Sequence, residues 1–118
     1  MEVKKALTVF HYAEKIKSNL ILAAKLLESL GNMKQEELAG AEKMFAAYLN
    51  AFISEVNIAA NASGVKEFRD VSAKLDEAAE QTLRHEYSAA MKLISEAISI
   101  TTTSGSGAAE VLKENNLI

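Results

Sequence analysis

Apolar residues recur along most of the chain at steps of three and four, and no stretch alternates with a period of two. Steps of three and four place side chains on one face of an α-helix, whereas strict alternation would indicate a β-strand. We therefore expect an all-α protein. The pattern predicts four amphipathic helices, over residues 2–30, 34–62, 65–84 and 87–101.

Short connections separate these four helices. Gly31-Asn32 and Gly64 follow the first two, and both residue types tolerate the left-handed conformation that ends many helices. A tight turn is expected at His85-Glu86, because one helix from residue 65 to residue 101 would be about 55 Å long. Consecutive helices joined by short connections lie antiparallel, so residues 1–100 are predicted to form an up-down-up-down four-helix bundle.

The last 18 residues read TTTSGSGAAEVLKENNLI. Threonine and glycine are poor helix formers, so we expect the fourth helix to end near residue 101. Residues 101–107 then form a flexible connector, and residues 108–118 form a short capping or arm helix. A phosphate-binding loop is not expected here, since the stretch follows a helix, lacks a lysine, and has Glu110 just beyond it.

The segment TLRHEYSAAMKLISEAISI resembles the turn and second helix of a tetratricopeptide repeat. Tyr87, Ala90 and Ala97 stand where that family has an aromatic residue and two small residues, and His85 stands in place of its turn glycine. No second copy follows at the period of about 34 residues that such repeats require. The resemblance implies a pair of antiparallel helices packed through small side chains, and not a repeat protein.

The second predicted helix is unusually apolar. Between Met44 and Ala62 its only formal charge is Glu55, although the surface helix of a monomeric bundle normally exposes a charged face. The first helix adds apolar residues on its outward side. Because large apolar patches usually mark contact surfaces, we expect a symmetric homodimer through these two helices. The expected interface comprises Ile21, Leu22, Phe45, Leu49, Phe52, Ile53 and Val56.

A polar stripe, formed by Asn50, Ser54, Asn57 and Asn61, follows the second helix at steps of four, three and four. The simplest interpretation is that these residues are the helix's narrow solvent-facing line. Alternatively, they form hydrogen bonds across an interface and fix its register, as a buried Asn does in coiled coils. A third possibility is a ligand pocket lined by their amides.

Composition limits the chemistry. The chain has no cysteine, which excludes disulfides, thiolate zinc sites and cysteine nucleophiles. Its two histidines, His11 and His85, lack the Glu-x-x-His spacing of di-iron bundles and are interpreted as surface residues. We expect no cofactor. No apolar run approaches the length of a membrane span, and no signal segment is evident, so we expect a cytoplasmic protein without membrane contact.

The one compact group of carboxylates is Asp76, Glu77 and Glu80, which is a weak candidate for a metal site. Glu77 and Glu80 resemble the acidic pair of the all-helical, Mg-dependent nucleotide pyrophosphohydrolases of the MazG type. The similarity ends there, because the second acidic motif of that family is missing downstream. The simpler interpretation is an ordinary charged helix surface.

Three classes of function therefore remain. The leading hypothesis is a small helical protein–protein interaction or scaffold module that pairs with itself and, in an assembly, with another protein. The alternative is a MazG-like hydrolase that uses Glu77 and Glu80. The third is an accessory subunit of a nucleic-acid complex, in which Lys4, Lys5, Lys15 and Lys17 contact phosphate. The net charge of −3 disfavours nucleic acid as a partner.

Overall fold

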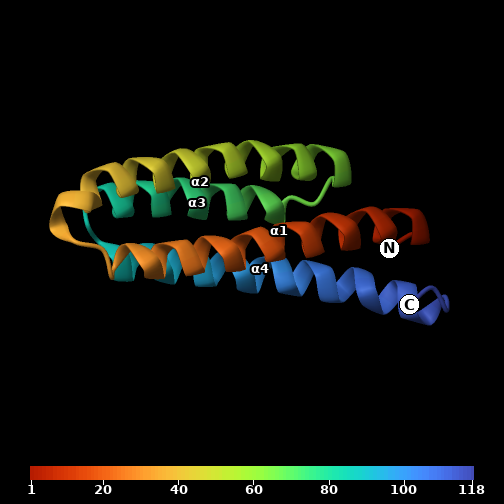
Figure 1. Ribbon diagram of the computed structural model, residues 1–118. Coiled ribbons are helices and arrows are strands. Elements are labelled where there is room, and N and C mark those ends of the chain that lie inside the picture. Colours follow the sequence, from red (N-terminus) through yellow and green to blue (C-terminus); the bar gives the residue numbers. More distant parts are fainter.

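The computed structural model describes residues 1–118 and contains four α-helices and no strand. The helices are α1 (Val3–Leu30), α2 (Gln35–Ser63), α3 (Glu67–Leu83) and α4 (Tyr87–Glu114). Each helix packs against the next, and α4 packs against α1, so that the four surround one core (Figure 1). The predicted all-α four-helix bundle is confirmed.

The bundle is elongated, with extents of 54 × 22 × 17 Å. Figure 1 shows that α1 and α4 continue past the α2–α3 turn, at the end that carries both chain termini. Helix α3 has only 17 residues, whereas α1 and α4 have 28 each and α2 has 29. The two-helix extension has a small core of its own, formed by Ala6, Val9, Ala108 and Leu112.

The main core is a continuous cluster of 22 buried residues, to which all four helices contribute. Its largest fully buried side chains include Phe68, Leu20, Leu49, Leu75 and Ile94. On α1 the buried positions recur at steps of three and four, as the sequence pattern predicts for one helix face: Ala6, Val9, Ala13, Ile16, Leu20, Ala23, Leu27 and Leu30. The three- and four-residue spacing of the sequence therefore identifies the inner face of α1 almost residue by residue.

The fourth helix is longer than predicted. Residues 101–107 are helical, so neither the flexible connector nor a separate short C-terminal helix is present. Thr101 is buried, and its hydroxyl donates a hydrogen bond to the carbonyl of Ala97 at 2.9 Å. Gly105 is also buried, and a Cβ atom placed on it would lie 3.2 Å from the Cβ of Ala13 on α1. Close packing against α1 thus outweighs the low helix propensity of this stretch.

The turns show where backbone conformation matters. Gly64 ends α2 with φ +71°, and its N–H donates to the carbonyl of Ala60 at 2.9 Å, as its position predicts. Gly31, by contrast, has φ −64°, so the left-handed conformation expected there is wrong. The turn between α3 and α4 falls at the predicted place, and His85 occupies it with φ +64°.

Candidate protein-interaction groove

Helix α1 has two neighbours, and it packs against them very differently. Its contact with α4 is the most extensive in the molecule, and its contact with α2 is the least. Two small buried residues, Ala13 of α1 and Gly105 of α4, meet in this contact and let the backbones approach. Along the α1–α2 contact lie the bulkier rings of Tyr12 and Tyr48, and this contact is left partly open.

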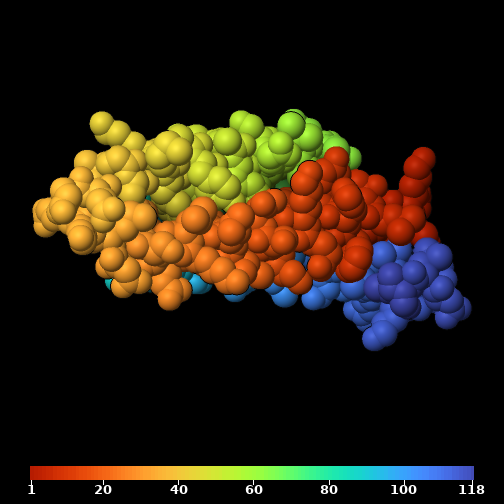
Figure 2. Space-filling model, in the orientation of Figure 1, coloured from red at the N-terminus to blue at the C-terminus, as the bar shows by residue number.

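Three hollows follow one another along the open contact, which lies on the face shown in Figure 2. We refer to them together as the α1–α2 groove. The hollow near the α1–α2 loop has a volume of about 350 Å³ and is lined by Leu26, Ser29, Met33, Ala41, Met44, Phe45 and Tyr48. The next, of about 320 Å³, is lined by Lys15, Asn19, Tyr48, Ala51, Phe52 and Glu55. A narrow third hollow of about 20 Å³ extends it to Tyr12, Ile16 and Ala59.

Tyr48 lies between the two larger hollows and lines both. Its hydroxyl donates a hydrogen bond to the carbonyl of Asn19 on α1 at 3.3 Å, so it bridges the groove. Its ring lies beside those of Phe45 and Phe52, with centroid distances of 6.4 and 6.2 Å. Burial raises the pKa of the Tyr48 phenol above its ordinary value. The groove is therefore floored by an aromatic row with one polar group at its centre.

The two ends of the groove differ in chemistry. The end near the α1–α2 loop is apolar, and its Leu26, Met33 and Met44 side chains are 40%, 41% and 75% exposed. The far end carries the opposite charges of Lys15 and Glu55. Flexible methionines on an apolar surface adapt to differently shaped partners. A groove of this composition is suited to another helix rather than to a small polar metabolite.

The interface residues predicted from the sequence differ in their burial in the structure. Phe45, Leu49, Phe52 and Val56 are at most 5% exposed and pack into the chain's own core. Most of the surface of these four side chains is therefore covered within the chain, because α2 turns this face toward the other helices, although Phe45 and Phe52 also line the α1–α2 groove. Their assignment to an intermolecular interface stays a prediction. Ile53 is half-buried against the same core.

The two remaining members of that set are exposed, at 42% for Ile21 and 47% for Leu22. Leu22 precedes the groove residue Leu26 by one helical turn, so it lies on the same side of α1. Ile21 follows Lys17 by one turn instead, and Lys17 lies on the side that faces α4. Leu22 thus borders the groove, whereas Ile21 does not.

The large apolar and aromatic groove residues Leu26, Met33, Met44 and Tyr48 were not part of the interface predicted from the sequence. The available signal was local, namely the one-turn spacing of Leu22 and Leu26 and the two methionines near the α1–α2 loop. This signal does not show which side of α2 faces α1, because Met44 and Phe45 are adjacent and equally apolar. Burial separates the two residues sharply, since Met44 is 75% exposed and Phe45 only 5%.

The polar stripe lies on the other side of α2. Asn57 accepts a hydrogen bond from the hydroxyl of Ser72 at 2.6 Å, and Asn61 accepts one from the guanidinium of Arg69 at 2.7 Å. Both donors belong to α3 of the same chain. The other two members, Asn50 and Ser54, are exposed. The stripe therefore runs along the α2–α3 contact, and half of it joins these helices.

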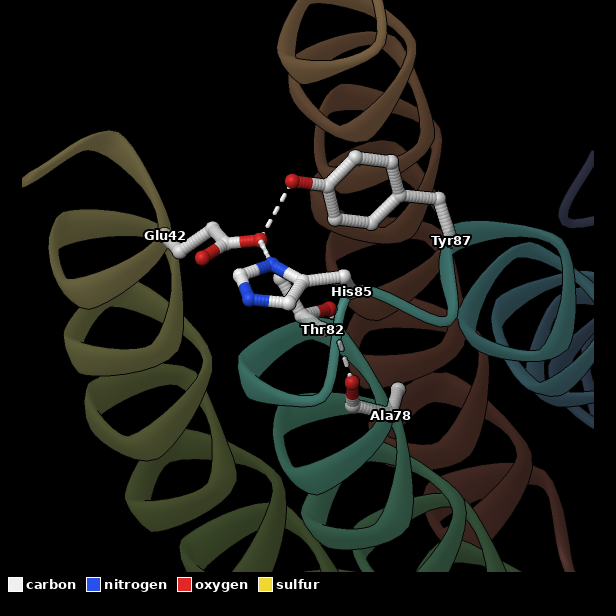
Figure 3. A network of polar contacts seen from close by, with 5 residues as sticks. All are labelled: Glu42, Ala78, Thr82, His85 and Tyr87. Atoms are coloured by element: carbon white, nitrogen blue, oxygen red, sulfur yellow. Dashed lines mark hydrogen bonds and ion pairs between the residues drawn. The ribbon is translucent and has the colours of Figure 1, made fainter. Parts of the chain in front are cut away.

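A buried carboxylate that the sequence did not single out lies at the same end of the bundle as the apolar end of the groove. Glu42 of α2 is only 3% exposed. Its Oε2 atom accepts a hydrogen bond from the Tyr87 hydroxyl and lies 2.6 Å from Nδ1 of His85 (Figure 3). Burial, the hydrogen bond to Glu42 and the negative charge of Glu42 raise the pKa of Tyr87 to about 12. This cluster fixes α2 to the turn between α3 and α4.

The acidic group on α3 shows no such convergence. Asp76, Glu77 and Glu80 are all exposed. Nowhere in the chain do three or more His, Asp or Glu side chains come close enough to hold a metal ion. The nearby Lys74 pairs across the molecule with Glu96 on α4, at 3.2 Å. His11 is exposed, with its ring edge-on to Tyr12.

Comparisons with protein-family models, with curated proteins and with solved structures found no match to this chain. None of the four helices is both long enough and apolar enough to cross a membrane.

Proposed function

We propose that the protein is a small helical interaction module that forms a homodimer through the α1–α2 groove. The observation that carries the proposal is the open α1–α2 contact, which is bordered by the exposed side chains of Leu22, Leu26, Met33 and Met44. Monomeric proteins rarely leave a contiguous row of large apolar side chains in water without a use for it.

The energetics allow at most a weak, reversible dimer. Full burial of a Leu or Met side chain contributes about 1.5–3 kcal/mol, so four that are about half exposed offer roughly 3–6 kcal/mol per subunit. Two subunits together therefore offer roughly 6–12 kcal/mol, against an association cost of about 4–15 kcal/mol. Since a dissociation constant of 1 μM needs a net gain of about 8 kcal/mol, the dimer is expected to be micromolar or weaker.

A second copy is a suitable occupant because the apolar end of the groove is self-complementary. In a two-fold dimer the same patch meets itself, so an axis through the apolar end would cover Leu26 and Met44 of one subunit with those of its partner. Lys15 and Glu55 lie farther along the groove and would stay at the solvated rim, where charged residues are tolerated.

A helix from a different protein is the second candidate occupant. The groove continues past Tyr48 to Lys15 and Glu55, and a dimer contact at the apolar end alone would leave this part empty. The extra length therefore favours a longer helical partner. An amphipathic helix with apolar residues at one end and charged residues at the other would fill both parts.

Sedimentation velocity over a concentration series tests the dimer. Wild type is expected to shift from monomer to dimer with increasing concentration. Met44→Lys should weaken association by about tenfold or more, because it places a charge in an apolar contact. Ile58→Lys is the matched control: Ile58 is also an apolar residue of α2, 56% exposed, but it lines none of the three hollows.

A wild-type protein that stays monomeric at every concentration would contradict the dimer. Equal effects of Met44→Lys and Ile58→Lys on association would place the interface outside the groove.

A further inference from the structure

His85 adopts a backbone conformation that a non-glycine residue seldom uses. Its φ of +64° lies in the left-handed region, which costs most L-residues about 1–2 kcal/mol relative to the right-handed one. Glycine would fit the same turn without this cost. A non-glycine side chain at such a position is a reason to ask what it does.

The imidazole of His85 has one nitrogen fixed and one free. Nδ1 lies 2.6 Å from the buried Oε2 of Glu42, which makes a short charge-assisted hydrogen bond with Nδ1–H as the donor. The His85 side chain is nevertheless 69% exposed. Figure 3 shows the second ring nitrogen, Nε2, pointing away from Glu42 and from the rest of the cluster.

Glu42 is itself held in place from two sides. Tyr87, the first residue of α4, donates a hydrogen bond from its hydroxyl to the same Glu42 oxygen that faces His85 (Figure 3). A buried carboxylate that accepts hydrogen bonds from both residues keeps the imidazole proton on Nδ1. The lone pair of the neutral ring is then on Nε2. It also stabilises any positive charge that develops on the ring. A carboxylate supports a reactive histidine in this way in many enzymes.

We propose that Nε2 of His85 is a phosphoryl-acceptor site, modified by donors with an activated P–N bond, the class to which phosphoramidate belongs. His85 lines none of the five main hollows, so we expect the donor to be small or to be presented on the surface of another protein. A phosphoryl group is a suitable electrophile here, because Nε2 of a neutral imidazole is a nucleophile and the His85 side chain is 69% exposed. Arg84 and Glu86 flank the site with opposite charges.

The reaction is a simple transfer without oxidation or reduction. The Nε2 lone pair attacks phosphorus, an N–P bond forms, and the P–N bond of zwitterionic phosphoramidate breaks. Its electron pair leaves with the amine, which departs as ammonia. The ring, still protonated on Nδ1, becomes a cation that carries the dianionic phosphoryl group, and the Glu42 carboxylate stabilises this cation. Glu42 is thus a positioning residue, and the reacting atom is Nε2 of His85.

The test is to incubate the full-length protein with potassium phosphoramidate and to follow phosphorylation of each histidine by mass spectrometry. His11 is a control within the same molecule, since it is exposed but has no carboxylate partner. His85 is expected to react about tenfold faster than His11 or more, which corresponds to about 1.4 kcal/mol of barrier. Phosphorus NMR should identify the Nε2 isomer.

Two variants separate reactivity from structure. His85→Gly suits the left-handed turn and should fold normally while losing the modification at this position. Glu42→Gln keeps the shape of the side chain but removes its charge. It should lower the rate at residue 85 toward that of His11 and yield a mixture of Nδ1 and Nε2 isomers, an outcome that a purely structural role of Glu42 would not produce.

Equal rates at His85 and His11 in the wild-type protein would overturn the proposal, and this comparison does not depend on the folding of any variant. Modification of His85 at Nδ1 would overturn it as well. Neither result bears on the dimer, because His85 lines none of the hollows of the α1–α2 groove.

Discussion

Helix α1 meets α4 and α2 along two contacts that differ in what fills them. Toward α4 it presents Ala13 to Gly105, with so little space that one added methyl group would lie 3.2 Å from its neighbour. Toward α2 it meets Tyr48, whose hydroxyl reaches only the backbone of Asn19. Small residues bring one pair of helices together, and an aromatic residue keeps the other pair partly apart.

The difference indicates which helix contact stabilises the fold and which one leaves surface free for binding. The α1–α4 contact extends from the main core into the two-helix extension, so it runs along the length of the molecule. The α1–α2 contact contributes less to the fold and leaves apolar side chains exposed. A contact that is weak within one chain has surface available for a second one.

The largest effect is expected from Gly105→Leu. The added side chain would meet Ala13 directly, and overpacking of this kind costs about 1–3 kcal/mol, here expected at the upper end. Gly107→Leu is the matched control, because a Cβ at that position meets nothing within 4 Å. Replacing this exposed helical glycine should raise stability by roughly 0.5–1 kcal/mol. Urea unfolding of both variants measures the difference, and equal midpoints would contradict a tight α1–α4 contact.

The next largest effect on stability is expected where Glu42 attaches α2 to the turn between α3 and α4. Tyr87→Phe removes a hydrogen bond to the buried Glu42 carboxylate, and such bonds to charged groups contribute about 1.5–3 kcal/mol. The variant should be less stable at neutral pH by an amount in this range, as measured by urea unfolding.

The same residue gives a pH-dependent prediction. The pKa of Tyr87 is about 12 in the folded protein against an ordinary 10.0, so above pH 10 the unfolded chain releases a proton that the folded protein retains. The free energy of unfolding should therefore decrease as the pH rises from about 10 to about 12. Tyr87→Phe should lack this part of the decrease. An identical pH profile for wild type and variant would show that Tyr87 is not held as the structure indicates.

A smaller effect is expected from Tyr48→Phe, which removes the one side-chain hydrogen bond across the groove. A neutral hydrogen bond of this kind contributes about 0.5–1.5 kcal/mol, and partial exposure places the loss near the lower limit. Amide hydrogen exchange should increase in α1 around Asn19 and remain unchanged where α1 meets α4. Uniform changes along α1 would mean that its two contacts are not independent.

The sequence predicts the helices well because their periodicity is a local property. The inner face of α1 and the three turns between helices follow from apolar spacing and from residues such as Gly64. The course of α4 does not, since its weak helix formers are compensated by Ala13, which lies some 90 residues earlier in the chain.

The candidate sites were harder to predict, because each depends on residues brought together by the fold. An excess of apolar residues in α2 is visible in the sequence, but the buried Phe52 and the exposed Ile58 look alike there. Glu42 and His85 are 43 positions apart, and no local pattern connects them. The rotation of α2 about its own axis determines which of its apolar residues are exposed and where Glu42 points. This rotation is set by the helices packed against α2.

The most direct test of the account is the accessibility of position 44 as a function of protein concentration. The chain has no cysteine, so Met44→Cys introduces a single thiol whose alkylation rate can be measured. If the α1–α2 groove binds a second copy, this rate falls as the concentration rises from the micromolar into the millimolar range, while that of Ile58→Cys stays constant. Rates that are independent of concentration at both positions would contradict the claim that the groove is the dimer interface.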